Sequence, residues 1–213
     1  MKPLVSIVDG ALPASQHRKL KAAIVGLGTE RIIAGYQTTF WYELGTRPGN
    51  LVEEAVVMLA PLVPEKQALG VEWWLSRMRT SNVKIDFHRD RDNARFDETR
   101  EERHPKVTSV LYLGGCRGGL LAVTREAPNP RNQAFAPDVH DFDLVTPRAN
   151  RFTWFDGTLT HGVLDANNDI PGRKLPMEPV LRLAIAVNFW AARPWRVPLY
   201  GQSRHYRALA LKE

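Results

Sequence analysis

Residues 87–90 read Phe-His-Arg-Asp, which places His88 and Asp90 two positions apart. On a strand, this spacing points both side chains to the same face. His161 could bring a second imidazole from a distant strand. Two imidazoles and one carboxylate on one side of a metal leave its other coordination positions open, as in non-haem Fe(II) sites. The sequence therefore predicts a metal centre formed by His88, Asp90 and His161.

Arg182 is a fourth residue whose type and position could do chemistry. It lies in a strand expected at 181–190, on a face that also carries the small residues Ala184 and Ala186. An arginine buried inside a β-structure is unfavourable unless it meets an anion. Arg182 could therefore hold the carboxylate of an organic acid bidentately. A structural salt bridge with a protein carboxylate is the alternative.

The other histidines and the cysteine fit a site less well. His17 is expected on a helix, His104 precedes a proline, and His205 lies in a basic tail. His140 begins a His-Asp-Phe-Asp cluster, but this cluster lies in a long loop without a strand around it. The single cysteine, Cys116, is expected to be a packing or loop residue without a catalytic role.

The composition indicates one globular domain. The chain has 213 residues, of which 44% are hydrophobic and 24% charged, so it can bury a substantial core. No apolar run approaches the roughly 20 residues that a membrane-spanning helix needs, and Asp9 comes too early for the core of a signal peptide. One cysteine excludes an internal disulfide and suits a reducing compartment. We therefore expect a cytoplasmic protein without a membrane partner.

The net charge of +6 permits an anionic partner, but the charge is not concentrated. Residues 89–103 carry five arginines against six acidic residues, so the charges of this segment nearly cancel. A solvated, mobile loop is the favoured interpretation of this segment, in preference to a nucleic-acid patch.

The chain begins with helical patterns and continues with short strands. Helices are expected at 14–27, with Ser15 as N-cap and Gly28 as a stop, and at 51–60. From about residue 71 the apolar period changes to two, and the expected strands are 83–87, 107–113, 119–124, 151–156 and 181–190. Polar, irregular loops at 89–104 and 125–150 flank the ligand strands and are expected to close over a substrate.

This order predicts an α+β fold that is mainly β: a double-stranded β-helix, or jelly roll, with N-terminal helices packed outside. We expect a single domain over residues 1–213. Within it, residues 1–70 form a helical support region, 71–192 the jelly-roll core, and 193–213 a C-terminal tail.

The order of these motifs resembles the 2-oxoglutarate/Fe(II)-dependent oxygenases, particularly their compact prolyl-4-hydroxylase-like members. The resemblance covers roughly residues 75–192 and includes the apolar run at 110–113 that leads into Gly-Gly-Leu-Leu at 118–121. It implies that His88, Asp90 and His161 bind iron. It also implies that Arg182 binds the far carboxylate of 2-oxoglutarate. Tyr112 could add a hydrogen bond to this cosubstrate, or it could be a packed tyrosine.

The chain departs from the family in two ways. Two positions after the arginine the family often has a hydroxyl residue, and this chain has Ala184. The gap between His161 and Arg182 is also long, so Arg173 and Lys174, and more remotely Lys84, are rival anchors for 2-oxoglutarate. Arg182 is favoured because it alone lies inside an expected strand.

The resemblance implies an enzyme that uses Fe(II), 2-oxoglutarate and O2, with ascorbate as a stimulant. Its substrate would be an amino acid, a peptide residue or a small metabolite, and Asp90 argues for hydroxylation because related halogenases lack this carboxylate. One alternative is a zinc-binding or non-enzymatic cupin-like module. Another is a nucleic-acid dealkylase, but such enzymes usually carry a second arginine where this chain has Asn188. Nucleic acid is therefore not expected as a partner, and the oligomeric state and exact substrate stay open.

Overall fold

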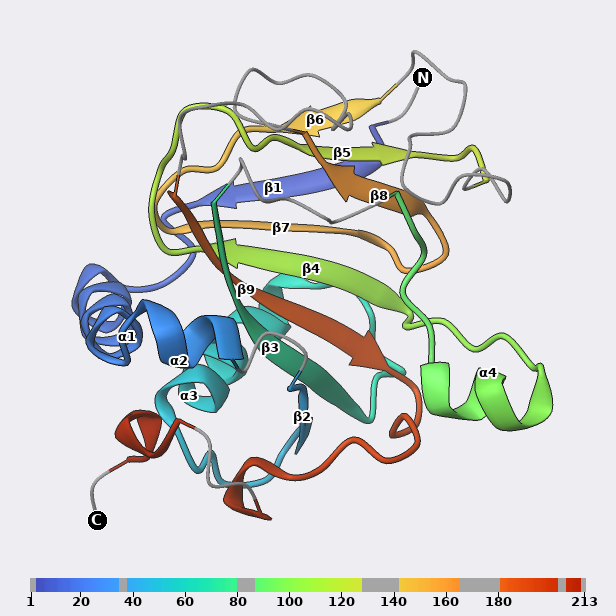
Figure 1. Ribbon diagram of the computed structural model, residues 1–213, viewed down its shortest axis with the longest axis horizontal. Helices are drawn as coiled ribbons and strands as arrows, with labels where there is room; N and C mark the ends of the chain where they lie inside the picture. The colour runs from blue at the N-terminus through green and yellow to red at the C-terminus, as the bar shows by residue number, and fades with distance from the viewer. Residues whose placement is uncertain are drawn as a thin grey trace.

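The computed structural model describes residues 3–34, 38–79, 87–127, 142–164, 181–202 and 206–211. Two antiparallel sheets form its centre, and helices lie outside them (Figure 1). The larger sheet has the strand order β1-β7-β4-β9-β3-β2, and the smaller has the order β6-β5-β8. This mainly β architecture with outer helices confirms the predicted jelly-roll class.

The strands of the larger sheet are β1 (Val5–Asp9), β2 (Phe40–Glu43), β3 (Gly70–Arg79), β4 (Val107–Tyr112), β7 (Arg151–Asp156) and β9 (Leu181–Trp190). Those of the smaller sheet are β5 (Leu121–Thr124), β6 (Asp143–Val145) and β8 (Thr160–Val163). The strand expected at 181–190 has the predicted bounds, and those expected at 107–113, 119–124 and 151–156 correspond to β4, β5 and β7.

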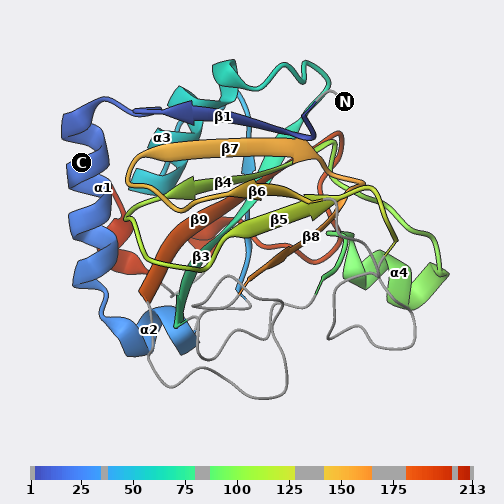
Figure 2. The same ribbon diagram turned by 90° about the horizontal axis from the view of Figure 1, so that it is seen from above.

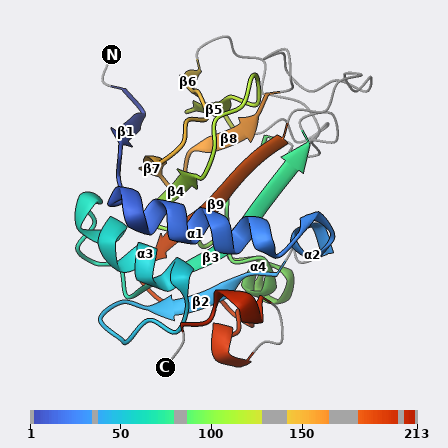
Figure 3. The ribbon, with the colours of Figure 1, turned by 90° about the vertical axis from the view of Figure 1, so that its left-hand side faces the viewer.

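Three helices cover one face of the larger sheet (Figure 3). They are α1 (Ala14–Gly26), α2 (Thr29–Ala34) and α3 (Leu51–Leu59), and a 3-10 turn, η1 (Ala60–Leu62), follows α3. Their apolar side chains pack in one core cluster with the apolar face of β9, as the alternation of that strand predicted. The β9 members of this core are Leu183, Ile185, Val187 and Phe189.

The first helix begins differently from the prediction. Ser15 was expected as its N-cap, but Pro13 occupies that position and no side chain caps the helix. Proline suits this place because its fixed φ, here −51°, is combined with an extended ψ. The helix therefore starts at Ala14, two residues earlier than a cap at Ser15 would place it. Gly28, the predicted stop, follows the helix with a φ of +80°, which glycine adopts without strain.

The N-terminal region also contributes strands, which the prediction of a helical support region did not include. β1 pairs with β7 and β2 pairs with β3, so the two strands form the edges of the larger sheet. In β2, Phe40, Trp41 and Tyr42 are all buried. Because both faces of this strand are covered, its sequence lacks the polar alternation that identifies a strand.

A short helix, α4 (Asn93–Thr99), lies in the segment that was expected to be an irregular loop. Asp92 accepts a hydrogen bond from the Arg95 amide and so caps it. None of the residues in α4 is buried, so the sequence had no apolar period there to reveal a helix. α4 lies at the opposite end of the molecule from α1 (Figure 2).

The C-terminal segment packs against the body of the protein, although the sequence suggested only a tail. It contains the 3-10 turns η3 (Tyr200–Gln202) and η4 (Arg207–Leu209), and Leu209 is fully buried in the helical core. None of the described helices is long and apolar enough to cross a membrane.

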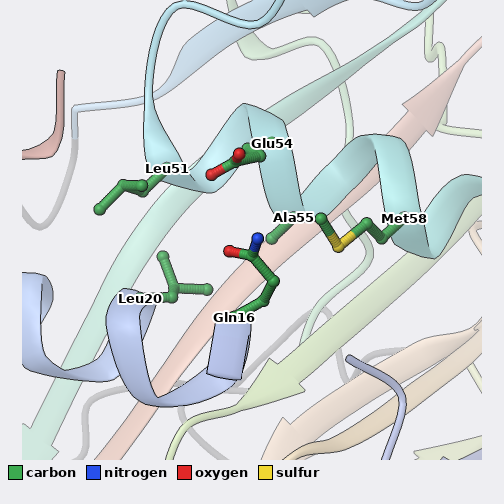
Figure 4. Close-up of a pocket in the computed structure, with 6 residues that line it drawn as sticks. All are labelled: Gln16, Leu20, Leu51, Glu54, Ala55 and Met58. Atoms are coloured by element: carbon green, nitrogen blue, oxygen red, sulfur yellow. The ribbon is translucent and has the colours of Figure 1, made fainter. Parts of the chain in front are cut away.

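Figure 4 shows a small hollow between α1 and α3. Its lining mixes apolar and polar side chains from the two helices: Gln16, Leu20, Leu51, Glu54, Ala55 and Met58. The hollow lies on the helical side of the larger sheet, away from the face that carries the predicted site residues.

Candidate metal and cosubstrate site

The structure brings His88, Asp90 and His161 together. One ligand atom from each residue lies within 4.8 Å of the others. The Nε2 atom of His88 is 3.3 Å from one carboxylate oxygen of Asp90, and the Nε2 atom of His161 is 3.5 Å from the other. Two imidazole nitrogens and a carboxylate therefore converge on one small volume, which is the donor set predicted from the sequence.

A single β-bridge places the two imidazoles side by side. The amides of His88 and His161 each donate to the carbonyl of the other residue at 2.9 Å. Gly162 permits this approach, because a Cβ there would lie 2.8 Å from the ring of buried Phe87. His161 belongs to β8, whereas His88 lies at an isolated bridge outside the named strands. Most of the strand expected at 83–87 lies outside the described residues.

Asp90 is held by two side chains of the larger sheet. Asn188 of β9 donates from Nδ2 to Asp90 Oδ2 at 2.9 Å, and the Thr108 hydroxyl of β4 donates to the same oxygen at 3.2 Å. These two residues are direct partners across the β4–β9 pair. His104 also contacts Asp90, with its Nδ1 atom 2.7 Å from the backbone carbonyl. The larger sheet therefore orients the carboxylate, and the smaller sheet orients the imidazoles.

The sequence did not identify Asn188 and Thr108 as partners of Asp90. Alternation placed Asn188 on the same face as Arg182, which was the available signal. It could not show that Asp90 would reach that face, because Asp90 comes from a segment between the strands.

The electrostatics of this cluster fit a divalent cation. Burial lowers the pKa of His161 to about 4, although Asp90 opposes this effect, so its imidazole is neutral at physiological pH. Its Nδ1 lies 3.3 Å from the carbonyl of Leu159, and a proton there leaves the Nε2 lone pair free toward Asp90. Burial acts to raise the pKa of Asp90, but the adjacent imidazoles and the Asn188 amide outweigh it and hold the pKa below its ordinary value.

Arg182 is buried on β9, with 4% of its surface exposed. Its Nε donates to the carbonyl of Gly119 at 3.1 Å, and its Nη2 donates to the Tyr112 hydroxyl at 3.2 Å. The guanidinium also lies 4.9 Å from the centre of the Tyr112 ring. Among the described residues Arg182 takes part in no ion pair. The alternative of a salt bridge therefore finds no partner in this part of the chain, and the surroundings fit an external anion.

The hydroxyl of Tyr112 lies beside the Arg182 guanidinium. Burial raises the pKa of its hydroxyl despite the adjacent guanidinium, so the hydroxyl keeps its proton at neutral pH. Because the oxygen accepts from Arg182, that proton remains available. Tyr112 pairs with Ala184 across the β4–β9 ladder, and both residues belong to a buried apolar cluster that also contains Leu121, Val123, Val145 and Phe155.

Several other residues that the sequence analysis considered lie away from this site or outside the described part of the chain. Cys116 is partly buried, and its thiol contacts the carbonyl of Gly118. His17 lies on α1, on the helical side of the sheet. The other candidates fall outside the described residues: Lys84, His140, Arg173, Lys174 and His205.

Of the two segments that were expected to close over a substrate, 89–104 is described in full and 125–150 only in part. Within 89–104, Arg95 pairs with Glu101 and lies 5.2 Å from the ring of Trp195, so it already has partners within the protein. Of the loop expected at 125–150, residues 143–145 form β6 and residues 128–141 lie outside the described part of the chain. The closure of these segments over a substrate stays a prediction.

Comparison with known proteins identifies the fold. No protein-family model matches the sequence, and a search of curated proteins finds no match. Among solved structures, the chain is similar to a prolyl-4-hydroxylase from Pseudomonas putida, with 19% identity, 89% of each chain covered and a TM-score of 0.51.

The chain is also similar to HygX from Streptomyces hygroscopicus, whose structure contains nickel and 2-oxoglutarate. The identity is 15%, the match covers 99% of this chain and 91% of that chain, and the TM-score is 0.51. For apo HygX the identity is 14%, the coverage 91% and 85%, and the TM-score 0.52. The chain therefore shares the fold of this prolyl-4-hydroxylase and of HygX, in agreement with the fold that the resemblance of the motifs implied.

Proposed function

We propose that this chain is an Fe(II)- and 2-oxoglutarate-dependent dioxygenase that hydroxylates, or otherwise oxidises, an amino acid, a peptide residue or a small metabolite. One observation carries the proposal: a pair of imidazoles, a carboxylate and a buried arginine without a described counterion occur together in this fold. The two imidazoles and the carboxylate alone would fit a simple metal-binding module. The buried arginine alone would fit an anion-binding module, so only the combination points to an oxygenase.

His88, Asp90 and His161 would hold the iron. With 2-oxoglutarate bound, Fe(II) supplies dioxygen activation coupled to oxidative decarboxylation, which yields succinate and carbon dioxide. The protein contributes ligands of the correct charge and direction. The bonds from Asn188 and Thr108 fix the carboxylate of Asp90, and burial keeps the imidazole of His161 neutral and ready to bind a metal.

Arg182 and Tyr112 would bind the far carboxylate of 2-oxoglutarate. The guanidinium is already oriented by Gly119 and Tyr112, so little side-chain freedom is lost when the anion binds. An anion would also satisfy the charge of a cation that is buried without an ion-pair partner among the described residues. The HygX structure with nickel and 2-oxoglutarate supports this choice of ligand.

The two alternative functions account for less of the site. A zinc-binding cupin-like module would use the three ligands but gives no role to Arg182. A nucleic-acid dealkylase would be expected to have an arginine at position 188, where Asn188 instead binds Asp90.

The proposal is tested by binding and by turnover. Under anaerobic conditions, the purified protein should bind one Fe(II), and adding 2-oxoglutarate should produce a visible charge-transfer band. In air, with ascorbate, a panel of amino acids and peptides should include a compound that stimulates succinate formation. Asp90→Ala should lose both signals, whereas Asp97→Ala, which changes an exposed carboxylate on α4, should keep them. Tight zinc binding with no affinity for 2-oxoglutarate in the presence of iron would overturn the proposal.

A further inference from the structure

Ser76 carries a buried hydroxyl that the site described so far does not use. The residue lies in β3 and is 6% exposed, and its Oγ has no hydrogen-bond partner among the described residues. A buried hydroxyl without a partner is unfavourable, and such groups are usually satisfied by protein, water or ligand.

The strand register places Ser76 beside the candidate cosubstrate site. Ser76 pairs with Ala184 across β3 and β9, and Ala184 pairs with Tyr112 across β9 and β4. Side chains of directly paired residues lie on the same face of a sheet. Tyr112, Ala184 and Ser76 therefore form one row across three neighbouring strands, which Figure 1 shows side by side.

This row has a hydroxyl at each end and only a methyl group at its centre. Adjacent strands are about 4.8 Å apart, so the backbones of Tyr112 and Ser76 are separated by roughly 10 Å. Arg182 lies two residues from Ala184 on the same face, and its guanidinium contacts Tyr112. On this face, the cation and the tyrosine therefore lie on one side of Ala184, and Ser76 lies on the other.

We propose that Ser76 is a third cosubstrate-binding residue, whose hydroxyl donates a hydrogen bond to the far carboxylate of 2-oxoglutarate. This inference rests on the proposed function. A carboxylate offers about four acceptor positions, so it can receive Arg182 and Tyr112 from one side and still accept from Ser76. A hydrogen bond to a charged oxygen is stronger than one between neutral groups, so this ligand would satisfy the hydroxyl well.

The chain offers a matched control in Ser109 of β4. Ser109 is also fully buried, but its hydroxyl donates to the carbonyl of Val187 and lies on the helical side of the sheet. Ser109→Ala therefore removes a buried serine hydroxyl of the same sheet without touching the face that carries Arg182.

The ligand can be varied in the same way. 2-Oxopentanoate has the chain length and keto acid of 2-oxoglutarate but lacks the far carboxylate. Equilibrium dissociation constants of both compounds would be measured by absorbance or calorimetry on the Fe(II)-loaded protein without oxygen. Thermal unfolding would be recorded for each variant.

Ser76→Ala should weaken the binding of 2-oxoglutarate about tenfold and leave that of 2-oxopentanoate unchanged. Ser76→Cys, which nearly keeps the volume of serine, should give the same loss if the alanine variant folds poorly. Ser109→Ala should lower thermal stability but keep both dissociation constants. Adding Ala184→Ser to Ser76→Ala returns a hydroxyl to the same row and should recover part of the affinity for 2-oxoglutarate.

Unchanged affinity for 2-oxoglutarate in folded Ser76→Ala and Ser76→Cys would overturn the inference and leave the proposed function standing. An equal loss for both keto acids would also overturn it, because Ser76 would then act on the sheet rather than on the far carboxylate. If the iron-loaded parent protein does not bind 2-oxoglutarate, the proposed function fails, and this inference fails with it.

Discussion

The two ends of the candidate site are built in different ways. At the cosubstrate end, Arg182 and Tyr112 lie in central strands of the larger sheet and are almost completely buried. At the metal end, His88 and Asp90 lie outside the named strands, and 43% of the His88 side chain is exposed. The first end is positioned by the strand ladder itself, whereas the second is assembled from segments that meet between the two sheets.

This difference has a physical consequence. A side chain on a central strand inherits its direction from a ladder of backbone hydrogen bonds. The metal end instead depends on the His88–His161 bridge and on the two bonds to Asp90. We therefore expect the metal end to respond to loss of a neighbouring side chain, and the cosubstrate end to respond mainly to loss of its own charged or polar groups.

The largest effect is expected for the three ligands. Alanine at His88, Asp90 or His161 should abolish turnover and weaken iron binding by more than the roughly 100-fold that outer partners typically contribute. The fold should persist, because these side chains are not part of the main apolar core. Iron content and circular dichroism would test this, with His17→Ala as control. Full iron occupancy in all three variants would disprove the ligand assignment.

A smaller effect, confined to the cosubstrate end, is expected for Arg182→Lys. The lysine keeps the charge but loses the bidentate fork, so the 2-oxoglutarate requirement should rise on the order of a hundredfold. Iron affinity should stay the same, because the strand ladder is intact. Steady-state kinetics and an iron titration would measure the two values. If the 2-oxoglutarate requirement is unchanged in Arg182→Lys but rises strongly in Arg173→Ala, the anchor for the cosubstrate is Arg173 and not Arg182.

Asn188→Ala should affect the metal end without removing a ligand. Asp90 loses the 2.9 Å bond that orients it, so iron affinity should fall about tenfold. At saturating iron the 2-oxoglutarate requirement should stay close to that of the parent protein, although Asn188 and Arg182 share a strand. Competition with a metal chelator would measure the affinity. If Asn188→Ala changes the cosubstrate requirement more than the iron affinity, the two ends are not independent.

The smallest effect concerns Glu72, which pairs with Asn188 across β3 and β9. Burial raises the pKa of its carboxyl to about 7, and the charges of Asp90 and Asp92 add to this effect. The folded state therefore holds its proton more tightly than the unfolded state, so stability should fall as the pH rises from about 4.5 to above 7. In Glu72→Gln this loss should be absent.

The difference in the free energy of unfolding between Glu72→Gln and the parent protein should grow by on the order of 1 kcal/mol between pH 5 and pH 8. This expected change is well below the maximum that the pKa shift of Glu72 would allow, because the Glu72 side chain keeps some contact with solvent. Urea unfolding of the metal-free proteins would measure it, with Glu30→Gln on α2 as an exposed control. A difference independent of pH would contradict the prediction.

The placement of Arg182 inside a strand could be predicted from the sequence because the information is local. The alternation of residues 181–190 separated the apolar face from Arg182 and its small neighbours, and the structure has the same two faces. The spacing of His88 and Asp90 likewise indicated a shared direction. His161 could be chosen among the other histidines because a strand pattern surrounded it.

The sequence was less informative where elements are short or covered on both sides. The edge strands β1 and β2 and the helix α4 were missed, because none of them has a clear apolar period. The rival anchors Lys84, Arg173 and Lys174 lie outside the described residues, so the choice among anchors stays a prediction.

The sequence by itself thus determined the fold class and the types of the residues that could bind a metal and an anion, because a side chain's face follows from the period of its own strand. Only the tertiary structure decided which strands are neighbours and in what register. That arrangement brings Asn188 and Thr108 to Asp90 and places Ser76 in a row with Tyr112. Pairing between distant strands depends on the packing of the whole sheet, and no local pattern in the chain specifies it.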